Sequence, residues 1–379
     1  MELIRVMESM KNGGNMQFTA SGRTAETERA LPDLDRWALP EVFLSTVRKL
    51  TAAEYIATAR IPGEHSYYTD RVPGPERAAG IDPLLLLECC RQAGPYGGRE
   101  FSGIESGGRF LIESLELALP GIRTAGRTQG AADLALAVTA EGRPGTPAAR
   151  RMSYAFDMTL PAGRLGTAAL RVRHVSRELY DGLRPARARK AVARPGAPVL
   201  PCTPVAPHLV GRTRPENVVL TRVAVEGGRA RALLRLPADN PALFDAGYDH
   251  VPAMALLEAA RQLALCAAAE TYGALPALTT VAGLDLRCHR FVEPHLPVTV
   301  RLSAYDTAER PAGLGAGLPQ PRSFRAAFEQ SGTTVAEGRL HLTTAGPEAQ
   351  ARRAESRRPV ALAAAGRDVP ATGAAGEPS

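Results

Sequence analysis

The sequence predicts an α+β protein in which one module occurs twice, each copy an antiparallel sheet wrapped around a long apolar helix. Two observations predict this fold. The pattern Leu-Leu-Glu-x-x-Arg-Gln occurs at 86–92 and again at 256–262, inside segments that are apolar on most sides. After each segment, apolar and polar residues alternate as in half-buried antiparallel strands. A helix that is apolar on most faces must be buried, and a curved sheet can enclose it.

The elements follow in the same order in both copies. Each copy opens with an extended segment, at 46–58 and at 209–221, and continues to the apolar helix, at 82–94 and at 252–265. Alternating strands follow the first helix near 108–117, 133–138 and 151–156, and the second near 284–288, 298–302, 323–328 and 334–342. An antiparallel sheet around one central helix is the hotdog arrangement. Two copies in one chain predict a tandem (double) hotdog fold that forms a pseudo-dimer.

Length and composition place the two copies between segments of different character. A chain of 379 residues is long enough for about two domains. We expect a disordered leader at 1–36, the first repeat at 37–179, a Pro/Arg-rich linker at 180–204, the second repeat at 205–345 and a disordered tail at 346–379. The prolines of the linker fix φ and remove N–H donors. We therefore expect a semi-rigid, solvated tether, with Arg184 among its exposed basic residues.

Charge and cysteine content exclude several classes of protein. The net charge is +7, but only three of the 46 basic residues are lysines, as in the arginine-rich products of GC-rich coding. No basic run is interleaved with aromatic residues, so no nucleic-acid partner is expected. No apolar run approaches the roughly 18 residues of a membrane span, so no membrane partner is expected either. Five cysteines without a C-x-x-C pair, and no secretory signal, predict a cytoplasmic location.

Each predicted helix carries one polar edge that is a candidate site. Residues three and four positions apart share a helix face, so a Glu, an Arg and a Gln at this spacing lie together. The two edges are Glu88, Arg91 and Gln92 in the first helix, and Glu258, Arg261 and Gln262 in the second. Burying a charge is costly unless it is paired, so each edge must face a partner or a polar cavity.

Two interpretations of these edges stay open. In the functional one, the glutamate of each edge is a general base, in an apolar setting that raises its pKa, beside an anion-binding arginine. In the structural one, each Glu–Arg pair is an ion pair within its helix that also fastens the two repeats together.

Two histidines lie close enough to a predicted helix start to join a site. His65 precedes the first helix, where a loop can bring it over the helix start, and it is a candidate catalytic residue. His250 directly precedes the second helix and is a candidate substrate-binding residue, as are Gln92 and Gln262. A surface or packing role is the alternative for both histidines. The other histidines have no metal-ligand spacing, so neither a metal nor another cofactor is expected.

Together these motifs resemble the A-factor biosynthesis (AfsA-like) family of γ-butyrolactone synthases. The resemblance rests on the D-P-L-L-L-x-E-x-x-R-Q helix, the basic Pro-rich linker, the R-x-R-P-E-N-V-V-L-T segment and the H-V-P-x-M-x-L-L-E-A-A-R-Q helix, and it covers about residues 40–345. The opening strands of this family often carry a histidine where this chain has Arg48 and Gly211. This departure leaves the roles of the histidines open.

The resemblance implies a double hotdog acyltransferase. The implied reaction joins a β-ketoacyl group, carried by an acyl carrier protein, to the hydroxyl of dihydroxyacetone phosphate. The product would be an ester precursor of a γ-butyrolactone-type signalling molecule that controls antibiotic production. By motif position, the implied catalytic pairs are Glu88 with Arg91 and Glu258 with Arg261. Such a reaction needs a base, a hold on the phosphate and an oxyanion donor, but no covalent enzyme intermediate.

Two other functions fit the same fold. One is an acyl-thioester dehydratase or thioesterase, which would act without the phosphorylated acceptor. The other is a non-catalytic hotdog protein that binds an acyl ligand or a lactone and regulates a partner. The acyl chain length, the oligomeric state and the choice between two pseudo-equivalent pockets are left open by the sequence.

Overall fold

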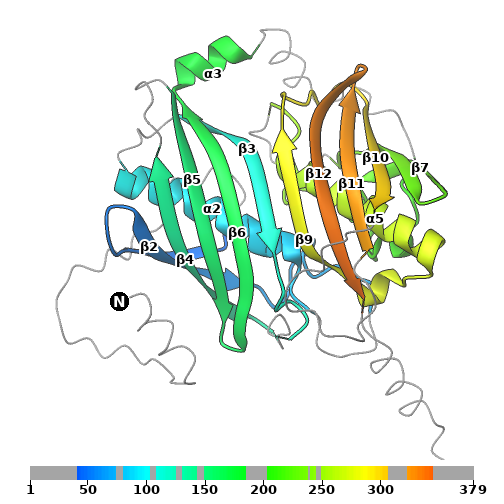
Figure 1. Ribbon diagram of the computed structural model, residues 1–379, viewed down its shortest axis with the longest axis horizontal. Coiled ribbons are helices and arrows are strands. Elements are labelled where there is room, and N and C mark those ends of the chain that lie inside the picture. The colour runs from blue at the N-terminus through cyan, green and yellow to red at the C-terminus, as the bar shows by residue number, and fades with distance from the viewer. Residues whose placement is uncertain are drawn as a thin grey trace, which may run out of the picture. The chain divides into compact units, whose positions relative to one another are not determined.

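The described residues form two similar halves on one sheet. The computed structural model describes residues 41–73, 80–102, 108–124, 130–142, 149–184, 203–237, 240–244, 249–305 and 322–344 (Figure 1). The predicted leader at 1–36 and tail at 346–379, and the linker from 185 to 202, lie outside these residues. Within them, the strands form a single 12-stranded antiparallel sheet.

The two halves contain corresponding elements. The first half has, in chain order, β1 Leu44–Lys49, β2 Glu54–Ile61, α2 Pro83–Ser102, β3 Arg109–Ala118, β4 Ala132–Gly142, β5 Ala149–Leu160, β6 Gly163–Val175 and α3 Arg177–Leu183. The second half has η2 Pro207–Val210, η3 Pro215–Asn217, β7 Leu220–Glu226, β8 Arg229–Leu234, α5 Ala253–Tyr272, η4 Pro276–Leu278, β9 Thr279–Cys288, β10 Val298–Tyr305, β11 Arg322–Gln330 and β12 Thr333–Thr344.

The sheet is continuous across the two halves. Its centre is the antiparallel pair β3 and β9, in register from Ser114 opposite Arg287 to Ala118 opposite Gly283. From this pair the order runs outward as β6-β5-β4-β2-β1 on one side and β12-β11-β10-β8-β7 on the other. The same chain order therefore occurs on both sides of the central pair.

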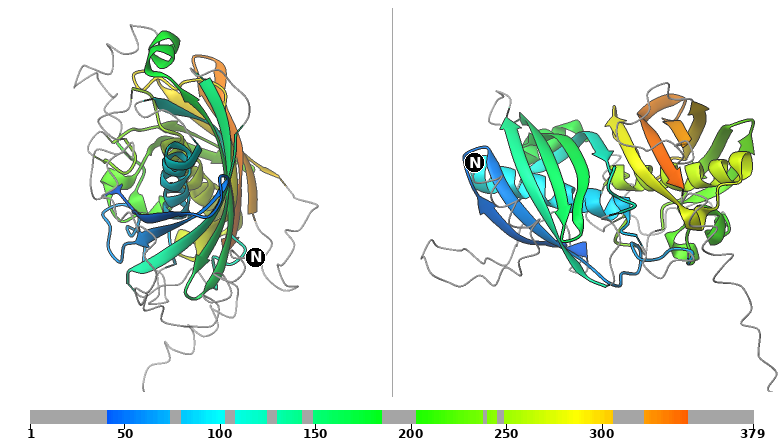
Figure 2. Two further views of the ribbon diagram at one scale, coloured as in Figure 1. Left: turned by 90° about the vertical axis from the view of Figure 1, so that its left-hand side faces the viewer. Right: turned by 60° about the horizontal axis from the view of Figure 1, so that its bottom comes forward.

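Both long helices lie on the concave side of the sheet (Figure 2). Residues 83–98 of α2 and 253–268 of α5 are buried, because both segments carry apolar side chains on most sides. Pro83 suits the first position of α2, where no N–H donor is needed. Gly273 ends α5 in the left-handed conformation, with φ 66°.

Helix α2 is longer than the sequence pattern predicts. It continues past Gly94 and through Pro95 to Ser102. Proline has no N–H to donate within the helix, yet the surrounding contacts hold this turn in place. The Tyr55 hydroxyl donates to the backbone oxygens of Ala93 and Gly94, at 3.1 and 3.2 Å. Tertiary packing therefore overrides the helix-breaking tendency of Pro95.

The opening segments and the start of the linker also differ from the prediction. The extended segment predicted at 46–58 is a hairpin, in which Leu50 and Thr51 donate to the Glu54 oxygen. The segment predicted at 209–221 contains 3-10 turns that start at Pro207 and Pro215 before β7 begins. Arg184, expected in a solvated linker, is buried, because Asp249 and Glu293 of the second half pair with it at 3.0 and 2.7 Å.

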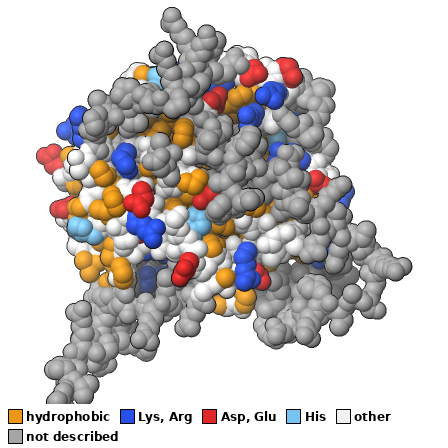
Figure 3. Space-filling view, turned by 180° about the vertical axis from the view of Figure 1, so that it is seen from behind, with side chains coloured by type: hydrophobic (Ala, Val, Ile, Leu, Met, Phe, Trp, Pro, Cys, Tyr) orange, Lys and Arg blue, Asp and Glu red, His pale blue; other side chains and the backbone are white. Residues whose placement is uncertain are grey.

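The surface carries both signs of charge. On the face seen from behind, the described arginines, lysines and acidic side chains are intermingled with apolar ones (Figure 3). Among the described residues, no helix is both long enough and apolar enough to cross a membrane.

Replacing Gly338 by Ala is expected to destabilise the sheet. A Cβ at this position of β12 would lie 2.1 Å from the backbone oxygen of Asp285 in β9, so the two strands would have to move apart. We expect the Gly338→Ala change to lower the free energy of unfolding by about 1–3 kcal/mol, measured by urea denaturation. Gly182→Ala is the control, since nothing lies within 4 Å of the added carbon in helix α3. It should stabilise by about 0.5–1 kcal/mol, and equal stability of both variants would contradict the sheet register.

Candidate active site

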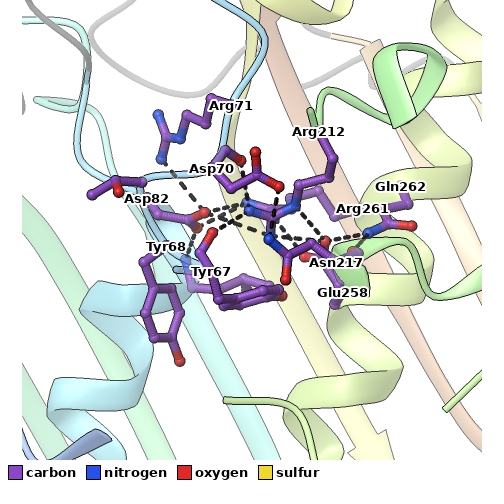
Figure 4. Close-up of polar contacts among 12 residues, drawn as sticks. Tyr67, Tyr68, Asp70, Arg71, Asp82, Arg212, Asn217, Glu258, Arg261 and Gln262 are labelled. Atoms are coloured by element: carbon purple, nitrogen blue, oxygen red, sulfur yellow. Dashed lines mark hydrogen bonds and ion pairs between the residues drawn. The ribbon is translucent and has the colours of Figure 1, made fainter. Parts of the chain in front are cut away.

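A buried group of ionic side chains lies where the start of helix α2 meets the middle of helix α5 (Figure 4). We refer to Arg71, Asp82, Arg212, Glu258 and Arg261 as the ionic cluster. The first two belong to the first half of the chain and the other three to the second. Asp82 directly precedes α2, and its Oδ1 accepts the backbone N–H of Leu84 at 2.8 Å. Asp82 thus caps this helix while it faces the other one.

Arg261 joins the two helices. Its Nη1 donates to both carboxylate oxygens of Asp82, at 2.8 Å each. Its Nη2 lies 2.6 Å from Oε2 of Glu258 on its own helix. Nη2 of Arg71, from the loop before α2, lies 3.6 Å from Oδ2 of Asp82. The sequence predicted the pairing of Glu258 with Arg261 from their spacing, but not the carboxylate from the other half.

Arg212 holds the loop before α2 against Glu258. Its Nε and Nη2 donate to Oε1 of Glu258, at 3.2 and 2.9 Å. Its Nη1 donates to the backbone oxygens of Tyr67 and Asp70, at 2.6 and 2.9 Å. Its guanidinium also lies over the Tyr67 ring, 4.2 Å from the centroid. Gln262 donates to the same Glu258 oxygen at 2.5 Å, so Oε1 is fully engaged.

Asp70 fastens the same loop to the second half. Its carboxylate accepts the backbone N–H of Thr213 at 3.0 Å, the hydroxyl of Thr213, and the side-chain amide of Asn217 at 2.7 Å. These donors are neutral, whereas the carboxylates of Asp82 and Glu258 face guanidinium groups. The ionic cluster itself therefore holds three positive and two negative charges in mutual contact, with Asp70 as a third carboxylate beside it.

The protonation states in the cluster follow from burial and pairing. Burial raises the pKa of Asp82, but the guanidiniums of Arg261, Arg71 and Arg212 outweigh it and hold that pKa well below its usual range. Burial lowers the pKa of Arg261, but Asp82 and Glu258 outweigh it and raise that pKa well above its usual value. Burial and the nearby Glu258 charge raise the pKa of Tyr67. Asp82 and Arg261 are therefore charged at neutral pH, and the Tyr67 phenol keeps its proton.

Several buried polar atoms in and beside the cluster have no hydrogen-bond partner among the described residues. They are Nε of Arg261, Nη2 of Arg71, the hydroxyl of Tyr67 and Oε2 of Glu258. Buried polar atoms normally find a partner, and an unpaired one costs free energy. Three of these four atoms are donors, so the site is suited to oxygen atoms of a bound anion or carbonyl.

The polar edge of the first helix forms a group of its own. Nε and Nη2 of Arg91 lie 2.6 and 2.8 Å from the two oxygens of Glu88, in a buried bidentate pair. Gln92 donates to Glu88 at 2.8 Å and to the Glu41 backbone oxygen at 2.7 Å, and accepts the Phe43 N–H at 2.9 Å.

The corresponding glutamine of the second helix makes equivalent contacts. Gln262 donates to the Asn217 backbone oxygen at 2.8 Å and accepts the Val219 N–H at 2.9 Å. Both Gln92 and Gln262 therefore fasten a helix to the segment that opens its half. Their predicted role in binding substrate stays a prediction.

The two candidate histidines lie in different places. Nδ1 of His65 accepts the backbone N–H groups of Tyr67 and Tyr68, at 3.1 and 3.2 Å, and its Nε2 lies 3.2 Å from Oε1 of Glu41. His65 thus supports the loop that contributes to the ionic cluster. Nδ1 of His250 lies 2.8 Å from Oδ1 of Asp249. The Asp249 carboxylate also accepts the Tyr180 hydroxyl and pairs with the buried Arg184, which directly follows helix α3.

Four residues of the site were not identified from the sequence: Tyr67, Arg71, Asp82 and Arg212. Two of them had a local signal. Asp82 stands before Pro83 at a helix start, a position that favours a capping carboxylate. Arg212 opens the R-x-R-P-E-N motif, which nevertheless gives no indication of its partner Glu258.

Neutralising Asp82 is expected to destabilise the fold strongly. Asp82→Asn leaves three buried guanidiniums with one carboxylate, and removing one partner of a buried pair costs about 3–5 kcal/mol. Because the folded-state pKa of Asp82 is depressed, its stabilisation is present above the unfolded pKa of about 3.9 and is lost as the pH falls below that value. The difference between variant and wild type in chemical denaturation should therefore shrink from pH 7 to pH 3.

A matched control is Asp133→Asn. Asp133 pairs with Arg60 at 2.8 Å at the surface, with 59% of its side chain exposed, so its loss should cost less than about 1 kcal/mol. Equal losses for the two variants would contradict the structural importance of the Asp82 pair.

Comparisons with known proteins identify the family. The model of the A-factor biosynthesis hotdog domain matches residues 35–175 and 197–345. A 2-oxo-3-(phosphooxy)propyl 3-oxoalkanoate synthase of Streptomyces virginiae is 32% identical over 79% of this chain and 92% of its own length. A synthase of the same name from Streptomyces coelicolor is 30% identical, over 74% and 81%. The solved dehydratase domain from the CurJ module of the curacin polyketide synthase aligns with a TM-score of 0.43 and 10% identity, over 81% of this chain and 98% of that domain. The family match and the two relatives confirm the predicted resemblance: the chain belongs to the A-factor biosynthesis hotdog family.

Proposed function

We propose that this chain is a synthase with the activity for which its relatives are named. It joins a β-ketoacyl group, supplied as a thioester, to the hydroxyl of dihydroxyacetone phosphate. The product is a 2-oxo-3-(phosphooxy)propyl 3-oxoalkanoate, a precursor of γ-butyrolactone-type signals. The observation that carries this proposal is the buried ionic cluster with unpartnered donors at the junction of the two halves. Membership of the family supports it.

The proposed architecture is a tandem hotdog with repeats at 37–179 and 205–345. It is supported by the two ranges matched by the family model and by the equal strand order on both sides of the central pair. The equivalent contacts of Gln92 and Gln262 with the opening segment of each half support it as well. On this interpretation, the ionic cluster lies between the repeats and needs both of them.

We place the phosphate of the acceptor on Arg71 and Arg261. Nη2 of Arg71 and Nε of Arg261 make no hydrogen bond to the described residues, and Nη2 of Arg71 has only the longer ion pair with Asp82, at 3.6 Å. The Arg71 side chain is 26% exposed, so it is the part of the cluster nearest to solvent. Guanidinium groups bind phosphate oxygens through two parallel N–H donors, which fixes orientation as well as adding affinity. A phosphate would also bring negative charge to a group in which three guanidiniums face two carboxylates.

We assign the general base to Glu258. Its Oε1 accepts three hydrogen bonds, whereas its Oε2 faces Nη2 of Arg261 at 2.6 Å without a hydrogen bond of good geometry among the described residues, so Oε2 is the oxygen that we propose takes the hydroxyl proton. In the reaction, the hydroxyl oxygen bonds to the thioester carbon while Glu258 takes the proton. The carbon–sulfur bond then breaks and the sulfur receives that proton. No covalent enzyme intermediate is needed, because positioning and proton transfer suffice.

We propose an acyl carrier protein as the β-ketoacyl donor and the cytoplasm as the compartment. The net charge of +7 favours encounter with an acidic carrier by electrostatic steering. The thiols of Cys89, Cys90, Cys266 and Cys288 are free, as expected for a protein kept in reducing surroundings.

Mass spectrometry of the reaction products tests this function. A β-ketoacyl thioester mixed with dihydroxyacetone phosphate should give the phosphorylated ester and one equivalent of free thiol, and both substrates should be required. Thioester hydrolysis without the acceptor would identify a thioesterase, and turnover of a β-hydroxyacyl thioester a dehydratase. Binding of the acyl compound without turnover would identify a regulator.

Two substitutions test the assignments. Glu258→Gln should lower kcat about 10²–10⁴-fold, because it removes the base without a change in size. Arg71→Ala should mainly raise KM for dihydroxyacetone phosphate, because it removes a contact to the part of the substrate that does not react. Glu88→Gln tests the alternative that the general base lies on the first helix. A loss of kcat in this variant, with Glu258→Gln as active as the wild type, would move the reaction to the first helix.

A further inference from the structure

The hydroxyl of Tyr67 is buried beside the ionic cluster without a hydrogen-bond partner among the described residues. Tyr67 is 1% exposed. Burial raises the pKa of this phenol well above its usual value, so the hydroxyl stays protonated and can only be used as a donor or a neutral acceptor. A phenylalanine would fill the same space without an unpaired polar atom. The hydroxyl therefore has no role in packing that explains it.

Other buried tyrosines of the chain differ in this respect. The hydroxyl of Tyr55 donates to two backbone oxygens of helix α2, that of Tyr154 lies 3.2 Å from Nε2 of His174, and that of Tyr180 donates to Asp249 at 2.5 Å. Among the described residues, the fold thus provides partners for these phenols but none for the Tyr67 hydroxyl, which is available to a bound ligand.

The Tyr67 ring is held rigidly. The Arg212 guanidinium covers one face, 4.2 Å from the ring centroid, and the Tyr68 ring packs against it edge-on at 4.8 Å. The backbone oxygen of Tyr67 accepts Nη1 of Arg212 at 2.6 Å. Figure 4 shows the ring among the side chains of the ionic cluster, and the charge of Glu258 acts on its phenol. A donor fixed in a water-excluded place is effective in stabilising charge that develops during a reaction.

We propose that the Tyr67 hydroxyl is a catalytic group that donates a hydrogen bond to the carbonyl oxygen of the acyl thioester. This inference rests on the proposed function. When the acceptor hydroxyl attacks the carbonyl carbon, the carbonyl π electrons move to the oxygen, and Tyr67 stabilises the resulting oxyanion while keeping its own proton. The carbonyl then re-forms, the carbon–sulfur bond breaks, and the sulfur takes the proton held by Glu258. Glu258 thus acts on the attacking hydroxyl oxygen, and Tyr67 acts on the carbonyl oxygen of the thioester.

His65 is the positioning residue for this donor. Its Nδ1 accepts the N–H groups of Tyr67 and Tyr68, so the ring proton is on Nε2, which faces Oε1 of Glu41 at 3.2 Å. The imidazole is buried, and its side chain is 6% exposed. It fixes the turn from which the Tyr67 ring projects and touches no reacting atom. The acceptor at Nδ1 is the feature that matters for this role.

Tyr67→Phe in the full chain tests the donor. It should lower kcat for ester formation about 10²–10³-fold, the usual effect of removing one oxyanion donor. KM for dihydroxyacetone phosphate should change little, because the phosphate contacts are intact. Tyr55→Phe is the matched control: it also removes a buried phenol hydroxyl, but from outside the site, and should keep the wild-type kcat. Circular dichroism checks that both variants are folded.

A kcat of Tyr67→Phe close to that of the active wild type would overturn the inference and leave the proposed function intact. A wild-type chain that forms no ester from the two substrates would overturn both. A raised KM for dihydroxyacetone phosphate with an unchanged kcat would place the hydroxyl on the phosphate instead, and would likewise overturn the inference.

Two substitutions of His65 test the positioning role. His65→Asn keeps an acceptor oxygen near the place of Nδ1 and should retain most of kcat, whereas His65→Ala should lose kcat at unchanged KM. In the Tyr67→Phe background, His65→Ala should have no further effect on kcat, because it acts through the missing hydroxyl. Independent, multiplying effects of the two substitutions would overturn the positioning role.

Discussion

The ion pair between Asp82 and Arg261 is the contact on which the rest of the site depends. It joins the residue that caps the start of helix α2 to the middle of helix α5, and both side chains are buried. Buried ion pairs contribute little net stability compared with apolar packing, because the cost of removing both charges from water nearly cancels their attraction. The role of such a pair is therefore to fix the geometry of the groups that it joins rather than to add stability. Here it fixes how the two helices lie against each other and keeps Arg261 directed toward the junction.

On the proposed tandem architecture, this contact also distinguishes the start of helix α2 from the start of helix α5. The repeated pattern relates residues 170 positions apart, so the counterpart of Asp82 is Pro252 at the start of α5. Proline carries no charge, and α5 begins without a side-chain cap. The arginine related to Arg261 is Arg91, which is held by Glu88 of its own helix in a bidentate pair. The start of helix α2 therefore has a charge pair with the other helix, whereas the start of helix α5 is uncharged.

The sequence predicted the parts of the site that depend on local geometry. Glu258, Arg261 and Gln262 lie together because residues three and four apart share a helix face wherever the helix is placed. The partners from distant segments had no such signal. Asp82 contacts Arg261 across 179 residues of sequence, and Arg212 contacts Glu258 across 46. These pairs come together only because both helices pack against the same sheet.

The predictions that were wrong also concern contacts that local sequence does not determine. The opening segments were expected to be extended, but turns and bends depend on contacts such as that between Leu50 and Glu54. Arg184 was expected in solvent because its neighbours are basic and proline-rich. Its carboxylate partners, Asp249 and Glu293, lie 65 and 109 residues further along the chain. Composition describes a segment but not the partners that fold over it.

The three guanidiniums of the cluster have different amounts of donor capacity left. Arg212 uses Nε and Nη2 for Glu258 and Nη1 for two backbone oxygens, so it is committed to holding the loop in place. Arg261 and Arg71 each keep one nitrogen that makes no hydrogen bond to the described residues. The cluster thus contains both residues that support the loop and residues with donors left for the proposed phosphate. Since that loop contributes Tyr67 and Arg71, an anion bound there would also stabilise the loop by mass action.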